Sequence, residues 1–145
     1  MVAVAEEIVD AKHALIEEFS FFDDWMGRYE YLIDLGKQLP PFPEEWKSED
    51  NKIHGCQSQV WLHARADGDR LHFDGTSDAA IVSGLIAVLL RVYNDRRPGD
   101  ILATKPDFIA DIGFTGHLSP TRSNGLHAML QAIYVRAQEQ LDRAS

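Results

Sequence analysis

One long apolar stretch constrains the fold of this chain more than any other feature. Between Ala79 and Val92 the only polar side chains are those of Ser83 and Arg91. A helix that is apolar almost all the way round is normally buried on most sides. We therefore expect a helix that runs to about Asn94 and forms the centre of the hydrophobic core.

Capping residues indicate where this helix and two others begin. Ser77 or Asp78 is suited to cap the core helix, and Ser20 or Asp23 is suited to cap an earlier one. Ser119-Pro120 has the pattern of an N-cap followed by proline in the first helical position, so it predicts the start of the last helix.

Apolar periodicity locates the flanking helices. Spacings of three and four residues predict a helix over residues 3–19, a second over about 23–39 and a third after Pro120. We expect the aromatic side chains of the first two to pack in the interior rather than bind a ligand; they are Phe19, Phe21, Phe22, Trp25 and Tyr29.

The periodicity changes from Gln59 onward. Apolar and polar residues alternate there, which predicts a strand. Asp67-Gly68 is expected to form a hairpin turn, and Arg70 to Asp74 a second strand. Ile53 and its neighbours are a weaker candidate for a third, short strand.

The order of these elements predicts an α+β fold, in which helices flank a small antiparallel sheet. Residues 44–52 are polar and are expected to form a surface loop, and residues 98–104 and 106–112 are expected to form short helices. Residues 1–145 are too few for several domains but enough for one core, so we expect a single domain.

Charge and hydropathy exclude several classes of function. The formal net charge of −9 disfavours a general nucleic-acid binder, because affinity for phosphate backbones needs basic surface. No apolar run reaches the roughly 20 residues of a membrane span. The acidic start, with Glu6, Glu7 and Asp10, is unlike a secretory signal, so we expect a cytoplasmic protein.

Cys56 is the only cysteine. A single thiol cannot form an internal disulfide or supply a cysteine-rich metal site. It is then either an inert buried residue or a nucleophile that acts alone. Gly55 permits a tight bend, Gln57 and Gln59 are poor core neighbours, and these features favour the nucleophile.

The histidines carry weaker signals. His54, if protonated and close to the thiol, would favour the thiolate, but a surface histidine is the simpler interpretation. His63 and His72 are placed to face each other across the hairpin as a metal pair, yet two such residues are usually not a site.

Four segments in order give the chain a resemblance to a known family. They are Tyr31-Leu32-Ile33-Asp34-Leu35-Gly36-Lys37 with Leu39-Pro40, Gly55-Cys56-Gln57-Ser58-Gln59-Val60-Trp61, Ser77-Asp78-Ala79-Ala80-Ile81-Val82 with Gly84-Leu85-Ile86, and Leu118-Ser119-Pro120-Thr121-Arg122-Ser123-Asn124-Gly125-Leu126. Together they resemble the SufE family, sulfur acceptors that partner cysteine desulfurases.

The resemblance implies a fold shared with iron–sulfur scaffold proteins of the IscU type. It implies that Cys56 takes sulfur from the persulfide of a desulfurase of the SufS or CsdA type. The carrier would stimulate that enzyme and pass the sulfur on for iron–sulfur cluster assembly. Pyridoxal phosphate would belong to the partner, so no cofactor or metal is expected in this chain, and we expect a carrier rather than an enzyme in its own right.

Two further residues match polar positions of the family motifs. Asp78 is otherwise a helix cap. Arg122 falls in a first helical turn, where the helix dipole disfavours a cation, so a role beside the Cys56 segment or toward the partner has the same weight as a structural one. We expect Cys56 to lie on a mobile loop, sheltered at rest and exposed when the desulfurase docks.

Several alternatives stay open. An iron–sulfur or zinc scaffold would need more ligands than one cysteine supplies. A cysteine hydrolase would need a paired base, and a binding module would leave Cys56 inert. An acceptor of the CsdE type would serve a different desulfurase. The oligomeric state is also open, and a homodimer is one alternative.

Overall fold

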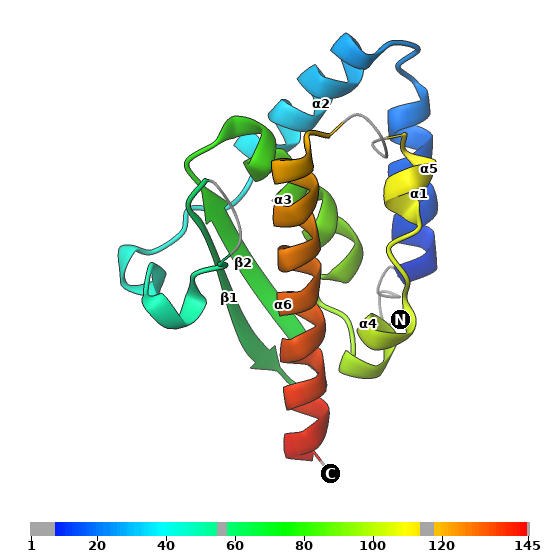
Figure 1. The fold of residues 1–145 in the computed structure, drawn as a ribbon. Coiled ribbons are helices and arrows are strands. Elements are labelled where there is room, and N and C mark those ends of the chain that lie inside the picture. Colours follow the sequence, from blue (N-terminus) through cyan, green and yellow to red (C-terminus); the bar gives the residue numbers. More distant parts are fainter. Residues whose placement is uncertain (1–7, 55–57, 114–117, 145) are drawn as a thin grey trace.

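The computed structural model describes residues 8–54, 58–113 and 118–144 (Figure 1). The helices and strands follow in the order α1 (Ile8–Ser20), α2 (Trp25–Lys37), η1 (Glu44–Trp46), η2 (Glu49–Asn51), β1 (Val60–Asp67), β2 (Arg70–Ser77), α3 (Ala80–Tyr93), α4 (Pro98–Ala103), α5 (Phe108–Asp111) and α6 (Pro120–Ala144), where η marks a 3₁₀ helix. The α+β prediction is confirmed. The predicted start of the first helix, at residues 3–7, lies outside the described residues.

Helix α3 is the centre of the core, as its composition predicts. The core residues that it contributes are Val82, Gly84, Leu85, Ile86, Val88, Leu89, Leu90, Val92 and Tyr93. It packs against α2 on one side and against the sheet and α1 on others, while α6 crosses in front of the sheet in Figure 1. None of the helices among the described residues is long and apolar enough to cross a membrane.

Two glycines set how closely α2 and α3 approach. A Cβ added to Gly84 would lie 2.3 Å from the carbonyl oxygen of Leu32, and one added to Gly36 would lie 2.6 Å from the amide nitrogen of Gly84. Real Cβ atoms do not come so close to backbone, so any larger residue would push the helices apart.

The hairpin differs from its prediction by one residue. Strand β1 pairs with β2 antiparallel with Asp67 opposite Arg70, which leaves Gly68 and Asp69 as the turn. Gly68 alone of the two has positive φ, +64°, as in a II′ turn. The predicted third strand at Ile53 is a single bridge, Lys52 to Trp61, rather than a strand.

Two of the predicted caps are wrong and one is confirmed. Asp24, not Ser20 or Asp23, caps α2, because its carboxylate accepts the N–H of Gly27 at 2.9 Å. The cap position of α3 is Ala79, so Asp78 lies one residue too early. The hydroxyl of Ser119 accepts the N–H of Arg122 at 3.2 Å, as an N-cap does.

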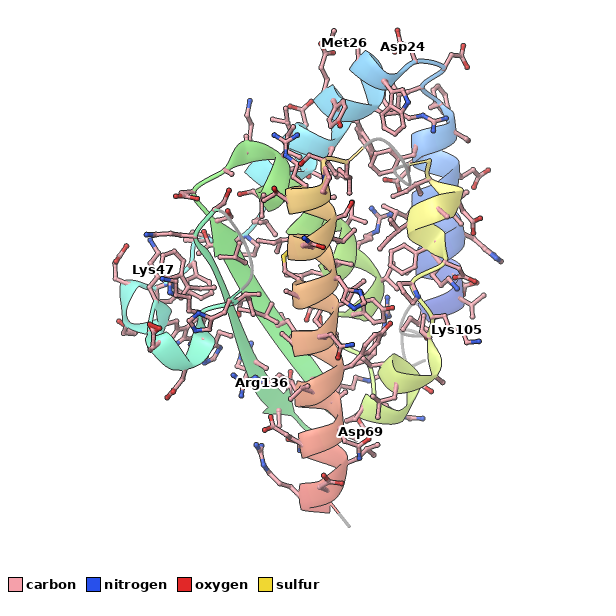
Figure 2. The ribbon with its side chains drawn as sticks, viewed as in Figure 1. Asp24, Met26, Lys47, Asp69, Lys105 and Arg136 are labelled. Carbon is pink, nitrogen blue, oxygen red and sulfur yellow. The ribbon has the colours of Figure 1, made fainter. Side chains whose placement is uncertain are left out.

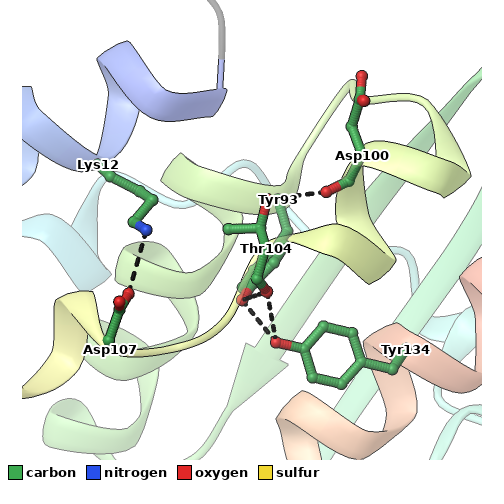
Figure 3. Close-up of polar contacts among 6 residues, drawn as sticks. All are labelled: Lys12, Tyr93, Asp100, Thr104, Asp107 and Tyr134. Carbon is green, nitrogen blue, oxygen red and sulfur yellow. Dashed lines mark hydrogen bonds and ion pairs between the residues drawn. The ribbon is translucent and has the colours of Figure 1, made fainter.

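A pair of tyrosines, Tyr93 buried and Tyr134 partly buried, joins α3 and α6 to the link between α4 and α5 (Figure 3). The hydroxyls of Tyr93 and Tyr134 donate to the carbonyl oxygen of Thr104 at 3.0 and 2.9 Å, and they lie 2.7 Å from each other. Burial raises the pKa of both phenols. At the same end of the molecule, Lys12 and Asp107 join α1 to α5 at 3.1 Å.

The polar segment 44–52 is an arm built on two 3₁₀ helices rather than an irregular loop. Figure 2 shows Lys47 on this arm, to the left of the sheet. The expected packing of the N-terminal aromatics holds for Phe19, which is fully buried, but not for Phe21, which is 88% exposed at the end of α1. Met26, on the first turn of α2, is also exposed.

Candidate functional site

The predicted nucleophile lies between two described segments. Cys56, with Gly55 and Gln57, falls outside the described residues, and so does the prediction of a mobile loop. The chain is described up to His54 on one side and from Ser58 on the other, and the surroundings of these two ends define the candidate site.

The exit from this segment is held by Asp78. Its carboxylate accepts the N–H of Gln59 at 3.1 Å, and its own N–H donates to the Gln59 carbonyl at 3.4 Å. Asp78 therefore joins the start of β1 to the turn before α3 instead of capping α3. The structure thus brings together two of the site residues predicted from sequence.

An apolar hollow of about 580 Å³ opens beside Ser58. Its walls come from the starts of α3 and α6 and from α2. The lining residues that matter most here are Ser58, Ala79, Ile81, Ser119, Arg122 and Met129. Because Ser58 is two residues from Cys56, the hollow lies within reach of the predicted nucleophile.

Arg122 lines this hollow from the first turn of α6. Its backbone N–H donates a hydrogen bond to the Ser119 hydroxyl, and the residue is exposed. The wall is otherwise largely apolar, so the guanidinium is the cation that the hollow offers among its described lining residues. Such a group favours an anionic occupant, as a thiolate or a persulfide would be.

The entry to the segment is held by the arm. The N–H of Ile53 donates to the Val60 carbonyl at 2.9 Å, and Asn51 donates its side-chain amide to the Trp46 carbonyl at 2.8 Å. The Trp46 ring stacks on His63, with ring centroids 3.8 Å apart and planes inclined by 2°. The arm is thus fixed to the outer face of β1 just before Cys56.

The sequence did not point to Trp46, and it raised His63 only as one half of a metal pair with His72. A tryptophan inside the otherwise polar segment 44–52 is the one signal that could have found this contact. His63 faces Asp74 across the hairpin, and its Nδ1 is buried without a hydrogen-bond partner among the described residues. Burial lowers the pKa of His63; Asp74 opposes the shift, and Arg65 adds to it.

His72 has different neighbours, so it does not pair with His63. Its Nδ1 lies 2.7 Å from the Asp95 carboxylate and its Nε2 lies 3.6 Å from that of Asp74. His54 lies 3.6 Å from Glu49 on the arm and is exposed. No group of three or more His, Cys, Asp or Glu residues among those described is arranged to hold a metal ion.

Comparisons with known proteins agree with the sequence motifs. The family described as SufE, the Fe-S metabolism associated domain, matches residues 13–137. An uncharacterized SufE-like protein of Rhizobium meliloti (strain 1021) is 42% identical over 132 residues, which cover 88% of this chain and 94% of the relative. A second such protein, of Rhizobium etli, is 42% identical over 129 residues, 86% of this chain and 87% of the relative.

A solved structure shares the fold. The solution structure of a hypothetical protein from Thermus thermophilus superposes with a TM-score of 0.76 and covers 91% of this chain and 96% of its own, at 22% sequence identity. That likeness concerns the fold alone. The family match extends over most of the chain, and on that ground the chain belongs to the SufE family, whose domain is associated with Fe–S metabolism.

Proposed function

We propose that this chain accepts sulfur on Cys56 from a pyridoxal-phosphate cysteine desulfurase and passes it on for iron–sulfur cluster assembly. Membership of the SufE family supports the proposal, and so does the presence of a single cysteine inside the family's motif. The chain would act as carrier and activator of the desulfurase rather than catalyse a reaction alone.

The transfer is a thiol exchange. The Cys56 thiolate attacks the outer sulfur of the donor's persulfide, and a new S–S bond forms as the donor's S–S bond breaks. The donor cysteine leaves as a thiolate, and the outer sulfur keeps its proton or gives it to water. No net oxidation occurs, since one S–S bond replaces another. The rate depends on the thiolate fraction and on access to the sulfur.

The observation that carries the proposal is the apolar hollow beside Ser58. A persulfide is lost readily to other thiols or oxidants in water, so a carrier benefits from a cavity that excludes them. The hollow, about 580 Å³ with a largely apolar wall, has room for a persulfide sulfur. Arg122 on its wall would favour the anionic sulfur.

Mass spectrometry tests the proposal directly. The chain is mixed with free cysteine and a desulfurase of the SufS type or, in a parallel reaction, of the CsdA type. We expect a gain of one sulfur on the peptide that contains Cys56 with one or both enzymes, and none with Cys56→Ser. An active desulfurase of each type that leaves the wild-type peptide unchanged would refute it.

The scaffold alternative predicts a different result. A scaffold would bind iron and sulfide, or zinc, at a fixed ratio without a desulfurase. Substitution of ligand residues besides Cys56 would then abolish binding of the metal or cluster. Reconstitution with ferrous iron and sulfide, followed by absorption spectroscopy, separates the two functions. A stable cluster on this chain would favour the scaffold.

A further inference from the structure

The outer edge of β1 carries backbone groups to which no described residue bonds. On β2, the backbone groups of Leu71 and Phe73 point away from β1, since they bond to residues 94–96. In an antiparallel pair, residues opposite one another point their backbone groups the same way, toward each other or both away. Ala66 and Ala64, which face those two residues, therefore point their N–H and C=O groups outward.

The arm occupies only the beginning of this edge. Ile53 bonds to Val60, and Lys52 bridges Trp61, as the first rung of a third strand would. Further along, no hydrogen bond from the described residues reaches the outward groups of Ala64 and Ala66. In Figure 1 no described element lies alongside the lower half of β1 on the edge that faces away from β2. The pairing of the arm with β1 therefore begins at this edge and does not continue along the strand.

The surface beside Ala64 and Ala66 is basic, although the chain as a whole has a net charge of −9. A shallow hollow at this edge is lined by three arginines, Arg65, Arg136 and Arg143, and by one carboxylate, Glu139. Figure 2 shows Arg136 on the side of α6 toward β1. Its contacts are the Asp50 carbonyl at 3.2 Å and Glu139 at 3.7 Å, so the positive charge is only partly compensated.

A larger space with a mixed polar and apolar lining continues from this hollow toward the Cys56 segment. Its volume is about 390 Å³, and Arg136 and Glu139 line both. Val135, 51% exposed on α6, contributes to it together with Leu62, and His54 marks its far end. An extended chain laid along the edge would fill this space and finish beside the residues that lead into Cys56.

We propose that the outer edge of β1 docks an extended, acidic segment of another protein, which adds a strand beside Ala64 and Ala66. Backbone pairing supplies affinity in this mode, and the alternate side chains supply specificity. Carboxylates on the face toward α6 would meet Arg136 and Arg143. A second copy of this chain is a poor occupant, because edge-to-edge pairing would bring the arginines against their own copies. The proposal goes beyond the sulfur chemistry of Cys56 and does not depend on it.

The test uses the ¹⁵N-labelled full chain and the peptide acetyl-Glu-Val-Glu-Val-Glu-Val-amide. We expect amide hydrogen exchange at Ala64 and Ala66 to slow at least tenfold near saturation, while the amides of His63 and Arg65, already bonded to β2, change little. The same peptide N-methylated at alternate amides keeps its charges but cannot pair, and it should bind at least tenfold more weakly.

Proline substitutions provide the matched variants. Ala64→Pro removes an outward N–H, so the chain should stay folded and lose at least tenfold in peptide affinity, whereas Arg65→Pro breaks the ladder to β2 and should lower the melting temperature. If Ala64→Pro does not fold, the N-methylated peptide still decides. Unchanged exchange at Ala64 and Ala66 with millimolar peptide would overturn the proposal, as would equal binding of the two peptides. A concentration-dependent dimer that protects these amides without peptide would also overturn it.

Discussion

Asp78 and Gln59 hold each other through two hydrogen bonds, one to the carboxylate of Asp78 and one from its backbone N–H. They are 19 residues apart, and the hairpin lies between them. Gln59 directly precedes β1 and lies three residues after Cys56. Its contact with Asp78 therefore fixes the end of the Cys56 segment to the turn that precedes α3.

Replacing Asp78 by Ala tests this contact. Because the lost bond is an exposed one, we expect the free energy of unfolding to fall by no more than about 1 kcal/mol. Sulfur acceptance should fall more clearly, by roughly fivefold for about 1 kcal/mol of lost positioning. Chemical denaturation and the rate of sulfur gain on Cys56 measure the two effects separately.

Asp78→Asn is the matched control, since its side-chain oxygen can still accept the Gln59 N–H. It should retain most of the acceptance rate. If Ala and Asn lower the rate equally, the charge of Asp78 rather than its hydrogen bond matters. If neither lowers it, Asp78 has no positioning role.

Arg122→Ala should slow sulfur acceptance without unfolding the chain. The guanidinium is exposed on the wall of the hollow, so its loss removes favourable charge and little packing. We expect a several-fold lower rate and a melting temperature within about 2 °C of the wild type. Arg122→Lys should restore part of the rate.

Lys105→Ala controls for the loss of one positive charge. This residue is exposed in the link between α4 and α5, and it does not line the hollow. Its replacement should leave sulfur acceptance unchanged. An equal decrease in both alanine variants would show that overall charge, not the position of Arg122, sets the rate.

Gly84→Ala should destabilise the fold strongly. The new Cβ would lie 2.3 Å from the Leu32 carbonyl oxygen, which belongs to the backbone of α2 and cannot turn aside. Overpacking of this kind costs about 1–3 kcal/mol or more. Gly99→Ala is the control: nothing lies within 4 Å of its Cβ, so alanine in α4 should be neutral or stabilising in thermal unfolding.

His63 should make stability depend on pH. Burial under Trp46 lowers the pKa of His63 in the folded chain below its usual 6.5, so the unfolded chain binds the proton more readily. The free energy of unfolding therefore decreases as the pH falls through about 6.5, until the folded-state pKa is reached. His63→Phe keeps a ring against Trp46 and removes this contribution.

Denaturation of both proteins between pH 5 and 8 measures the effect. The variant should be about 1 kcal/mol more stable at pH 8, because it also removes a buried nitrogen to which no described residue bonds. Its advantage should grow on acidification. A constant difference across this range would mean that His63 titrates normally in the fold.

Local patterns predicted most of the fold because they act over a few residues. The apolar stretch within 79–92 is the buried helix α3, and the alternation after Gln59 is β1. The errors concern the exact residue at which a helix is capped or a turn is made. Asp23 and Asp24 are equally good caps by type, and it is Asp24 whose extended backbone places its carboxylate on the N–H of Gly27.

The site was predicted only in part, because its contacts join residues far apart in the chain. Asp78 was assigned to the helix that follows it, yet its carboxylate bonds to Gln59 across the hairpin. The stack of Trp46 on His63 has no sequence period, since it depends on how the arm folds back. Sequence motifs named Cys56, Asp78 and Arg122 as candidate residues, whereas the tertiary fold decides the partners of those that the structure describes.

The two anchored ends limit how far the sulfur can travel. Ile53 is bonded to Val60, and Gln59 is bonded to Asp78, so only a short span of backbone between them is without these anchors. A fully extended chain advances at most about 3.6 Å per residue, so the Cα of Cys56 stays within about 11 Å of that of Gln59. In the proposed role as a carrier, this chain would not swing its cargo between distant enzymes on a long tether. A sulfur donor and a sulfur acceptor would each have to dock against the same small area of this protein, and therefore in turn.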